Sequence, residues 1–288
     1  MKPPPFTYHR PTDVAQAVAT LGEVGARGKV LAGGQSLVPL MSMRLAEPAH
    51  LVDIGRLPGL DTVEVTSRQV RVGALVRHAD LERHEEAHAA NPVLRQALRH
   101  VAHPTIRNRG TSVGSLCHAD AAAEMPAVLA LLGGHVVAVS TAGEREVPVD
   151  ELYVGPLETS LRPDEVVTAA AFPVPEGCVG TSVVEVARRQ GDYAVCGVVA
   201  LVRLAEDGSL DEARAAYVSV ADVPPVLDLT EAVRGISPDG DWAPAGEAAK
   251  ERLECDGDIH VSAQYRHHLV GVLTERALRE AATRAEAG

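Results

Sequence analysis

Apolar side chains near the N-terminus recur first with the period of a helix and then in short runs typical of buried strands. Val14, Val18 and Leu21 share one face of a helix that Thr12 can cap. The predicted order is a helix from about Thr12, a strand at 29–32, a turn at Gly33-Gly34, a helix at 37–45 capped by Ser36, and a strand at 51–54. This alternation predicts a small α/β unit.

A change of pattern at Val63 predicts a second region. Val63-Glu64-Val65 and Val70-Arg71-Val72 alternate as two paired strands around a polar turn. The other expected elements are helices at 79–88 and 92–101, an irregular stretch at 103–120, a helix at 121–132 ended by Gly133, and strands at 135–140 and 166–172. Strands and helices are therefore interleaved in this region.

The last part of the chain follows a linker at 173–177, which is rich in proline. Strands at 194–204 and 213–220 predict a hairpin around Asp207-Gly208. Three helices are expected after it, the last from about Ser262 with apolar residues at helical spacing. This part is predicted to be an α+β domain, a strand layer covered by helices.

Composition narrows the class of protein. The 288 residues are 46% hydrophobic and 23% charged, as in an ordinary globular protein, and the net charge of −12 disfavours nucleic acid and anionic membranes. The four cysteines have no CxxC spacing, so we expect neither an iron–sulfur cluster nor zinc in this chain. No apolar run has the length of a membrane span, and the start lacks a secretory h-region. A cytoplasmic protein with reduced thiols is expected.

Two glycine-rich turns are the candidate sites. Ala32–Ser36 lies between a strand and a helix, and Gly110–Ser115 follows Arg107 and Arg109. Glycines permit close backbone approach, and helix N-termini and arginines suit a phosphate-bearing ligand. Taken alone, a Gly-Gly turn such as the first is more often structural, and the second could equally be a tight turn. Neither is a GxGxxG or a P-loop motif.

Polar residues after the second turn have structural interpretations as well as functional ones. Asp120 can be a helix N-cap, Glu124 a first-turn acid, and His118 a packed or surface residue. Four other histidines have no acidic partner at a metal-binding interval, and we interpret them as solvated helix faces. They are His84, His88, His100 and His103.

Both turns lie inside longer motifs. Residues 30–39 are VLAGGQSLVP, residues 107–116 are RNRGTSVGSL, and His118-Ala119-Asp120 precedes Glu124-Met125-Pro126-Ala127. These segments resemble three motifs of the FAD-binding medium subunits of molybdenum hydroxylases, the group that includes carbon monoxide dehydrogenase and xanthine dehydrogenase. The first resembles the first FAD motif, the second resembles the second FAD motif (usually RNRGTIGGSL), and the third resembles the HADP run. Segments at 6–11, 51–54, 73–78, 188–194 and 265–269 also fall in family order, so the resemblance covers essentially the whole chain.

The resemblance implies a fold and a role. The fold is α+β, with a two-subdomain FAD-binding α/β region at 1–175 (subdomains about 1–57 and 58–175) and a C-terminal α+β domain at 176–288. The role is electron transfer through noncovalent FAD to an external acceptor. A small partner would carry [2Fe-2S] clusters and a large partner molybdopterin, in a dimer of heterotrimers. The substrate, which the large partner holds, stays open between carbon monoxide, a purine, an aldehyde and a heteroaromatic ring.

The resemblance also implies cofactor-binding residues, with no catalytic or metal-binding residue in this chain. The first turn and its helix would contribute Ala32, Gly33, Gly34, Gln35, Ser36 and Leu37. The second turn and the residues after it would contribute Thr111, Ser112, Val113, Gly114, Ser115, His118, Asp120, Glu124 and Leu161.

Three departures from the family pattern bear on this site. Ser112-Val113 replaces Ile-Gly, and a valine would be costly if its position needs a positive φ. Ala121 replaces a proline, and Glu185 falls near a position where related chains often have lysine. Two alternatives therefore stay open: a stand-alone FAD-dependent oxidoreductase, and a non-catalytic assembly subunit that has lost FAD.

Overall fold

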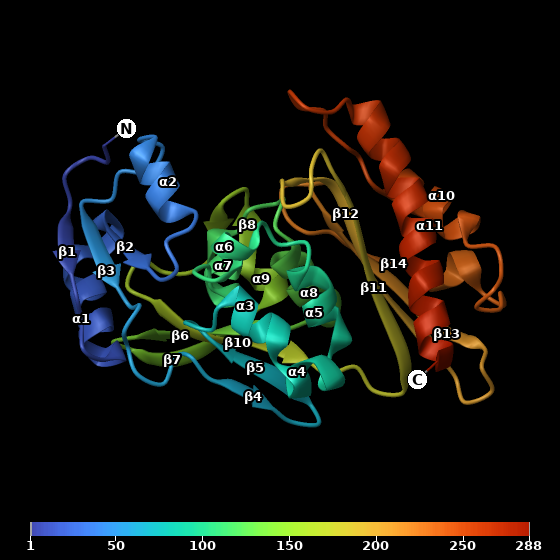
Figure 1. Cartoon of the computed structure of the whole chain (residues 1–288), viewed down its shortest axis with the longest axis horizontal. Helices are drawn as coiled ribbons and strands as arrows, with labels where there is room; N and C mark the ends of the chain where they lie inside the picture. Colours follow the sequence, from blue (N-terminus) through green and yellow to red (C-terminus); the bar gives the residue numbers. More distant parts are fainter. Residues whose placement is uncertain (1, 288) are drawn as a thin grey trace.

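The computed structural model describes residues 2–287, and its first layer is the predicted α/β unit, drawn in blue in Figure 1. Three parallel strands are ordered β1-β3-β2. The elements are β1 (Thr7–His9), α1 (Val14–Val24), the 3-10 turn η1 (Gly25–Arg27), β2 (Gly28–Leu31), α2 (Leu37–Ser42) and β3 (His50–Asp53). Asp13, rather than Thr12, caps α1, because its carboxylate accepts a hydrogen bond from the Gln16 N–H at 2.8 Å.

The second layer is built on a five-stranded antiparallel sheet with the order β4-β5-β10-β6-β7. Its strands are β4 (Val63–Val65), β5 (Gln69–Gly73), β6 (His135–Ser140), β7 (Gly143–Pro148) and β10 (Val166–Pro173). A small hairpin, β8 (Tyr153–Gly155) and β9 (Glu158–Thr159), lies beside it. The central strand β10 is buried over nearly its whole length, which explains its continuous apolar sequence.

Helices fill the space between this sheet and the C-terminal part (Figure 1). They are α3 (His78–Arg83), α4 (Glu85–Ala90), α5 (Pro92–Leu98), α6 (Pro104–Arg107), α7 (Ser112–His118), α8 (Glu124–Leu132) and α9 (Val149–Leu152). The helix predicted at 79–88 is interrupted at His84, whose Nδ1 accepts a hydrogen bond from the Ala87 N–H at 3.2 Å and so caps α4. The stretch predicted to be irregular, 103–120, contains α6 and α7.

The third layer is a four-stranded antiparallel sheet with the order β11-β12-β13-β14. Its elements are β11 (Cys178–Ala187), β12 (Ala194–Leu204), β13 (Leu210–Val218), β14 (Val226–Asp228), the 3-10 turn η2 (Thr230–Val233), α10 (Ala243–Arg252) and α11 (Ala263–Ala287). The predicted hairpin and the predicted last helix are confirmed. One of the three predicted helices is only the short turn η2.

The C-terminal sheet is buried on both faces, as the position of β11 and β12 between α5, α8 and α11 in Figure 1 shows. On β12, Val199 and Leu201 join the core shared with α5, α7 and α8, whereas Val198 and Val202 join the core under α10 and α11. Side chains alternate across a strand, so a strand buried on both faces must be apolar throughout. The fold class predicted from the sequence is confirmed.

Within the described residues, no helix combines the length and the apolar composition needed to cross a bilayer. The four cysteines carry free thiols.

The contact between α11 and the sheet depends on Gly180 of β11. A Cβ on Gly180 would lie 1.9 Å from the carbonyl oxygen of Ala281 and 2.4 Å from the N of Ala285. We expect Gly180→Ala to force α11 away from the sheet and to lower the free energy of unfolding by about 1–3 kcal/mol. Thermal unfolding followed by circular dichroism measures this loss.

The matched control is Gly22→Ala in α1, where a Cβ would meet no atom within 4 Å. This change should raise stability slightly, by up to about 1 kcal/mol, through helix propensity alone. Equal melting temperatures for wild type and Gly180→Ala would show that the close contact is not needed.

Candidate functional site

The two glycine turns, far apart in the sequence, lie directly against each other. A Cβ on Gly33 would lie 2.5 Å from the carbonyl oxygen of Arg109, 2.8 Å from Cα of Gly110 and 3.1 Å from N of Thr111. A side chain at this position would therefore collide with backbone, which cannot move aside as a flexible side chain can. The structure thus brings the two predicted motifs together into one site between the first and second layers.

The first turn leaves a row of backbone donors free. Gly34 has a φ of +72°, a left-handed conformation that glycine adopts without strain. The amide nitrogen of the Gln35 side chain donates to the Gly33 carbonyl at 3.1 Å, which closes the turn. Across residues 2–287, the N–H groups of Gly33 to Leu37 have no hydrogen-bond acceptor. Such a row of donors is suited to an anionic group.

Ser36 does not have the predicted capping role. It occupies the position before α2, but its hydroxyl makes no capping hydrogen bond. Because the hydroxyl is not used within the helix, it adds a further donor at the same end of α2. Ala32, Gln35 and Leu37 are all half-buried beside it.

The second turn is the start of α7. The Thr111 hydroxyl caps this helix by accepting a hydrogen bond from the Gly114 N–H at 3.1 Å. Ser112 and Val113 are buried in its first turn, and Ser115 is half-buried. Val113 has the backbone of a helix and no positive φ. The departure from glycine at this position therefore carries no backbone strain.

Of the two arginines before the second turn, Arg107 does not act as expected from the sequence. Arg107 pairs with the Glu82 carboxylate at 3.0 Å and donates to the carbonyls of Val101 and Ala102 at 3.0 and 3.1 Å. Its guanidinium therefore supports the loop before α6 instead of facing a ligand. The Arg109 side chain is exposed.

His78 is a supporting residue that the sequence did not indicate. It is 4% exposed, its N–H donates to the Gly110 carbonyl at 3.0 Å, and its Nδ1 lies 3.3 Å from the Ser112 hydroxyl. Burial, and after it the charge of Arg107, lowers the pKa of His78 to about 4. At neutral pH the His78 ring is therefore neutral, and the residue supports the second turn through its contacts with Gly110 and Ser112.

Polar residues gather at the other end of α7. Ala119, in the left-handed conformation, ends the helix. The His118 ring lies 4.0 Å from the Asp120 carboxylate. Burial lowers the pKa of His118, the nearby Asp120 carboxylate opposes this shift, and the charge of Lys29 on β2 adds to it. Asp120 is not the N-cap of α8, which is Ala123; its carboxylate instead accepts from the Ala122 N–H at 2.9 Å.

The remaining predicted residues approach from two sides. Glu124 is 7% exposed at the start of α8, and burial raises its pKa to about 7. Leu161 follows β9 and packs half-buried against the main core. Its hairpin is tied to the end of α7, since the Leu157 N–H donates to the Ala119 carbonyl at 2.9 Å.

The C-terminal layer closes the site. Gly191, in the loop between β11 and β12, packs so closely on His103 that a Cβ would lie 2.6 Å from its ring. The same loop places the exposed Tyr193 near Asp120 and Glu124. Partial burial of the phenol raises the pKa of Tyr193, and the charges of Asp120, Asp192 and Glu124 raise it further. His84 has a capping contact and is half-buried, contrary to the expectation of a solvated helix face, whereas His103 is exposed as expected and packs on Gly191.

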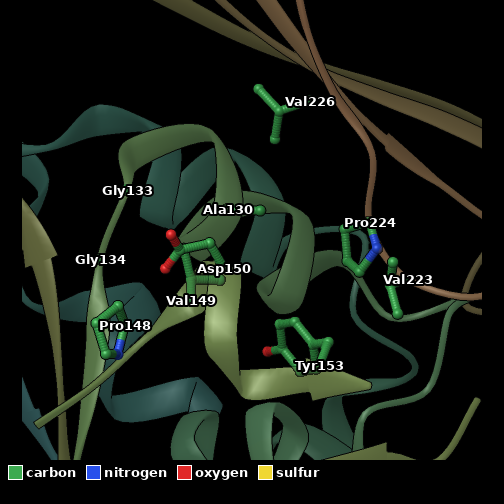
Figure 2. Close-up of a pocket in the computed structure, with 10 residues that line it drawn as sticks. All are labelled: Ala130, Gly133, Gly134, Pro148, Val149, Asp150, Tyr153, Val223, Pro224 and Val226. Atoms are coloured by element: carbon green, nitrogen blue, oxygen red, sulfur yellow. The ribbon is translucent and has the colours of Figure 1, made fainter. Parts of the chain in front are cut away.

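A cavity of about 440 Å³ lies elsewhere, between α8, α9, β8 and the segment before β14. Figure 2 shows Tyr153, Asp150 and Val149 on one side of it and Val223 and Pro224 on the other. None of the site residues predicted from the sequence lines it. Over residues 2–287, no group of three His, Cys, Asp or Glu side chains is arranged to hold a metal.

The chain is similar to known proteins along nearly its whole length. Residues 4–175 match the family described as the FAD binding domain in molybdopterin dehydrogenase, and residues 182–281 match the CO dehydrogenase flavoprotein C-terminal domain. It is 40% identical to the nicotine 6-hydroxylase medium subunit of Paenarthrobacter nicotinovorans, over 99% of this chain and 100% of that one.

Two solved structures have the same fold. A chain of quinoline 2-oxidoreductase from Pseudomonas putida 86 superposes with a TM-score of 0.92 and 34% identity, over 99% of both chains. A chain of carbon monoxide dehydrogenase from Hydrogenophaga pseudoflava superposes with a TM-score of 0.92 and 33% identity, again over 99% of both.

The depressed pKa of His78 predicts a stability change in mild acid. As pH falls below 6.5, the unfolded chain takes up a proton at this position, but the folded chain does so only near pH 4. Stability present above pH 6.5 is therefore lost as pH falls, by about 3 kcal/mol in total. Urea unfolding of the full chain at several pH values measures this slope, and His78→Gln should make it shallower.

His268→Gln, on the exposed side of α11, is the matched control and should keep the wild-type slope. A His78→Gln protein with the wild-type slope would contradict the assignment.

Proposed function

Because this chain belongs to the family of FAD-binding subunits of molybdopterin dehydrogenases, we propose that its two facing glycine turns hold one noncovalent FAD. The chain is the FAD-binding medium subunit of a multi-subunit molybdenum hydroxylase, and in such complexes molybdopterin and iron–sulfur clusters belong to other subunits. The chemistry that FAD supplies when bound is acceptance of electrons from [2Fe-2S] clusters on a small partner and their release to an external acceptor.

The observation that carries the cofactor proposal is the row of unpaired N–H groups from Gly33 to Leu37, facing the second turn across the Gly33 contact. The diphosphate is the part of FAD that such donors suit, and the backbone of the second turn lies directly beside Gly33. We assign the diphosphate and ribityl chain to Ala32–Ser36 and Thr111–Ser115, the flavin ring to Leu37 and Leu161, and further polar contacts to His118, Asp120 and Glu124. These residues bind and orient the cofactor.

The alternatives gain no support from the site. The reason to consider an assembly subunit without FAD was Val113, and this residue lies in an unstrained helical turn. A stand-alone oxidoreductase would have to bind and oxidise its own substrate. The relative that is 40% identical is instead a medium subunit, matched over its full length.

We further propose the domain boundaries of the chain and the subunit composition of its complex. The three-stranded sheet supports a subdomain at about 1–57, the five-stranded sheet one at 58–175, and the four-stranded sheet a domain at 176–288. Relatives are medium chains of complexes with large and small subunits, and we propose a dimer of such heterotrimers. The free thiols support a cytoplasmic location.

The cofactor assignment predicts the effect of a substitution at Gly34. Valine there would be strained at a φ of +72° and would touch the Leu31 and Val38 side chains at 3.3 Å. Gly34→Val should lose most of the bound flavin, measured as the ratio of flavin to protein absorbance after gel filtration. Acid precipitation of wild type should release the flavin, because it is bound noncovalently.

Gly59→Val is the matched control, because it imposes the same type of strain at a φ of +77° with no atom within 4 Å. It should keep its flavin. Equal flavin content in Gly34→Val and wild type would exclude the first turn from the site.

The assignment as a medium subunit predicts co-purification with two partners. A tagged chain expressed with its genomic neighbours should elute with one larger and one smaller polypeptide, and the complex should contain molybdenum and iron. A dimer of heterotrimers would show twice the summed mass by light scattering. A chain that elutes alone, holds flavin and is reduced rapidly by an organic substrate would instead establish a stand-alone enzyme.

A further inference from the structure

The carboxyl end of β3 carries a polar pair that none of the assigned cofactor contacts includes. The phenol of Tyr8 on β1 donates a hydrogen bond to the carboxylate of Asp53, the last residue of β3. The other carboxylate oxygen accepts a hydrogen bond from the Gly55 N–H at 2.8 Å. Asp53 is half-buried and Tyr8 is exposed, so the pair is accessible to a ligand.

Strand pairing places this carboxylate beside the first glycine turn. Asp53 pairs with Leu31, the last residue of β2, and the two strands lie side by side in Figure 1. The Leu31 side chain lies against the turn, because its Cδ1 is 3.3 Å from the position of a Cβ on Gly34. A Cβ on Gly55 would lie 2.9 Å from Oδ1 of Asp53 and 3.9 Å from the carbonyl oxygen of Ala32. The carboxylate and the first turn therefore border the same space.

This space lies on the face of the three-stranded sheet opposite α1. A Cβ on Gly28 of β2 would lie 2.5 Å from a side-chain carbon of Val24 in α1, so this position faces the helix. Side chains alternate along a strand, so Leu31, three residues later, faces the other side. Paired residues of neighbouring strands share a face, and Asp53 therefore points away from α1 and is not covered by it.

The Asp53 carboxylate can accept further hydrogen bonds. A carboxylate offers about four lone-pair sites. Among residues 2–287, only Tyr8 and Gly55 donate to it, one to each oxygen. Because a carboxylate repels the diphosphate of FAD, the group that it suits is an uncharged donor. FAD has such donors in the hydroxyls of its ribityl chain and of its adenosine ribose.

The order of contacts along the first turn selects the adenosine ribose. Leu37, at the far end of the turn, is assigned to the flavin ring, whereas Asp53 lies at the Ala32 end. With the diphosphate between these two ends, the half of an extended dinucleotide that reaches Asp53 is adenosine. In other dinucleotide-binding sheets, too, an acid at the carboxyl end of the neighbouring parallel strand binds a ribose hydroxyl.

We propose that Asp53 accepts a hydrogen bond from the 2′- or 3′-hydroxyl of the adenosine ribose of FAD, and that Tyr8 positions its carboxylate. This inference rests on the proposed function, in which the first turn holds the diphosphate of the same cofactor. Asp53 lies in the segment 51–54, which follows the family order but contains none of the cofactor-binding residues predicted from the sequence. The contact makes the site selective for the complete dinucleotide over a flavin without adenosine.

Analogues of FAD that lack one hydroxyl of the adenosine ribose test this contact. The flavin-depleted complex is titrated with FAD, with the 2′-deoxy analogue and with the 3′-deoxy analogue, and binding is followed by the change in flavin fluorescence. Wild type should bind at least one deoxy analogue about tenfold more weakly than FAD, because a hydrogen bond to a charged group is lost. Asp53→Ala should bind all three with similar affinity, because the acceptor is absent.

The ratio of affinities within one variant separates a ligand contact from a structural role. A loss of folded protein weakens the binding of all three ligands equally and leaves the ratio unchanged. Tyr8→Phe keeps the acceptor but removes the hydrogen bond that positions it, so its ratio should fall between those of wild type and Asp53→Ala. Asp61→Ala, at an exposed position, is the matched control and should keep the wild-type ratio.

Two results would overturn the inference and leave the proposed function intact. One is equal affinity of wild type for FAD and both deoxy analogues, and the other is an Asp53→Ala complex that discriminates between them as wild type does. A wild-type complex that binds none of the three ligands would instead overturn the proposed function, and the role of Asp53 with it.

Discussion

The backbone contact between Gly33 and the Arg109–Thr111 segment is the constraint on which the site depends. It joins the three-stranded parallel sheet to the helices of the second layer at a point where no Cβ fits. Because the second turn occupies one side of Gly33, the following N–H groups are directed away from protein acceptors. The same close approach connects the first two layers and lies beside free donors that an anionic ligand needs.

Packing behind the second turn gives this contact its rigidity. His78 and Arg107 are both polar, but both form contacts within the protein. His78 contacts Gly110 and Ser112, and Arg107 binds the Glu82 carboxylate and two backbone carbonyls. On the far side, the C-terminal sheet is sandwiched between α5, α8 and α11.

The sequence predicts those parts of the fold that are determined by neighbouring residues, such as helix ends and tight turns. Gly133 and Gly208 mark a helix end and a hairpin, and both have the positive φ that their positions require. Strands β1 and β11 were not predicted, because β1 is short and exposed and β11 is held by pairing with β12 and by α11. For the site, the motifs indicated the two turns, but the supporting role of His78 depends on contacts between distant segments.

The charges of the site form a gradient along α7. Free N–H groups of the first turn lie at its N-terminal end, whereas Asp120 and Glu124 follow its C-terminal end, about 10 Å away by the rise of a seven-residue helix. A dinucleotide with an anionic diphosphate and an uncharged, hydrogen-bonding ring is oriented by such a gradient. The net charge of −12 makes this local order necessary, because the chain as a whole repels an anion.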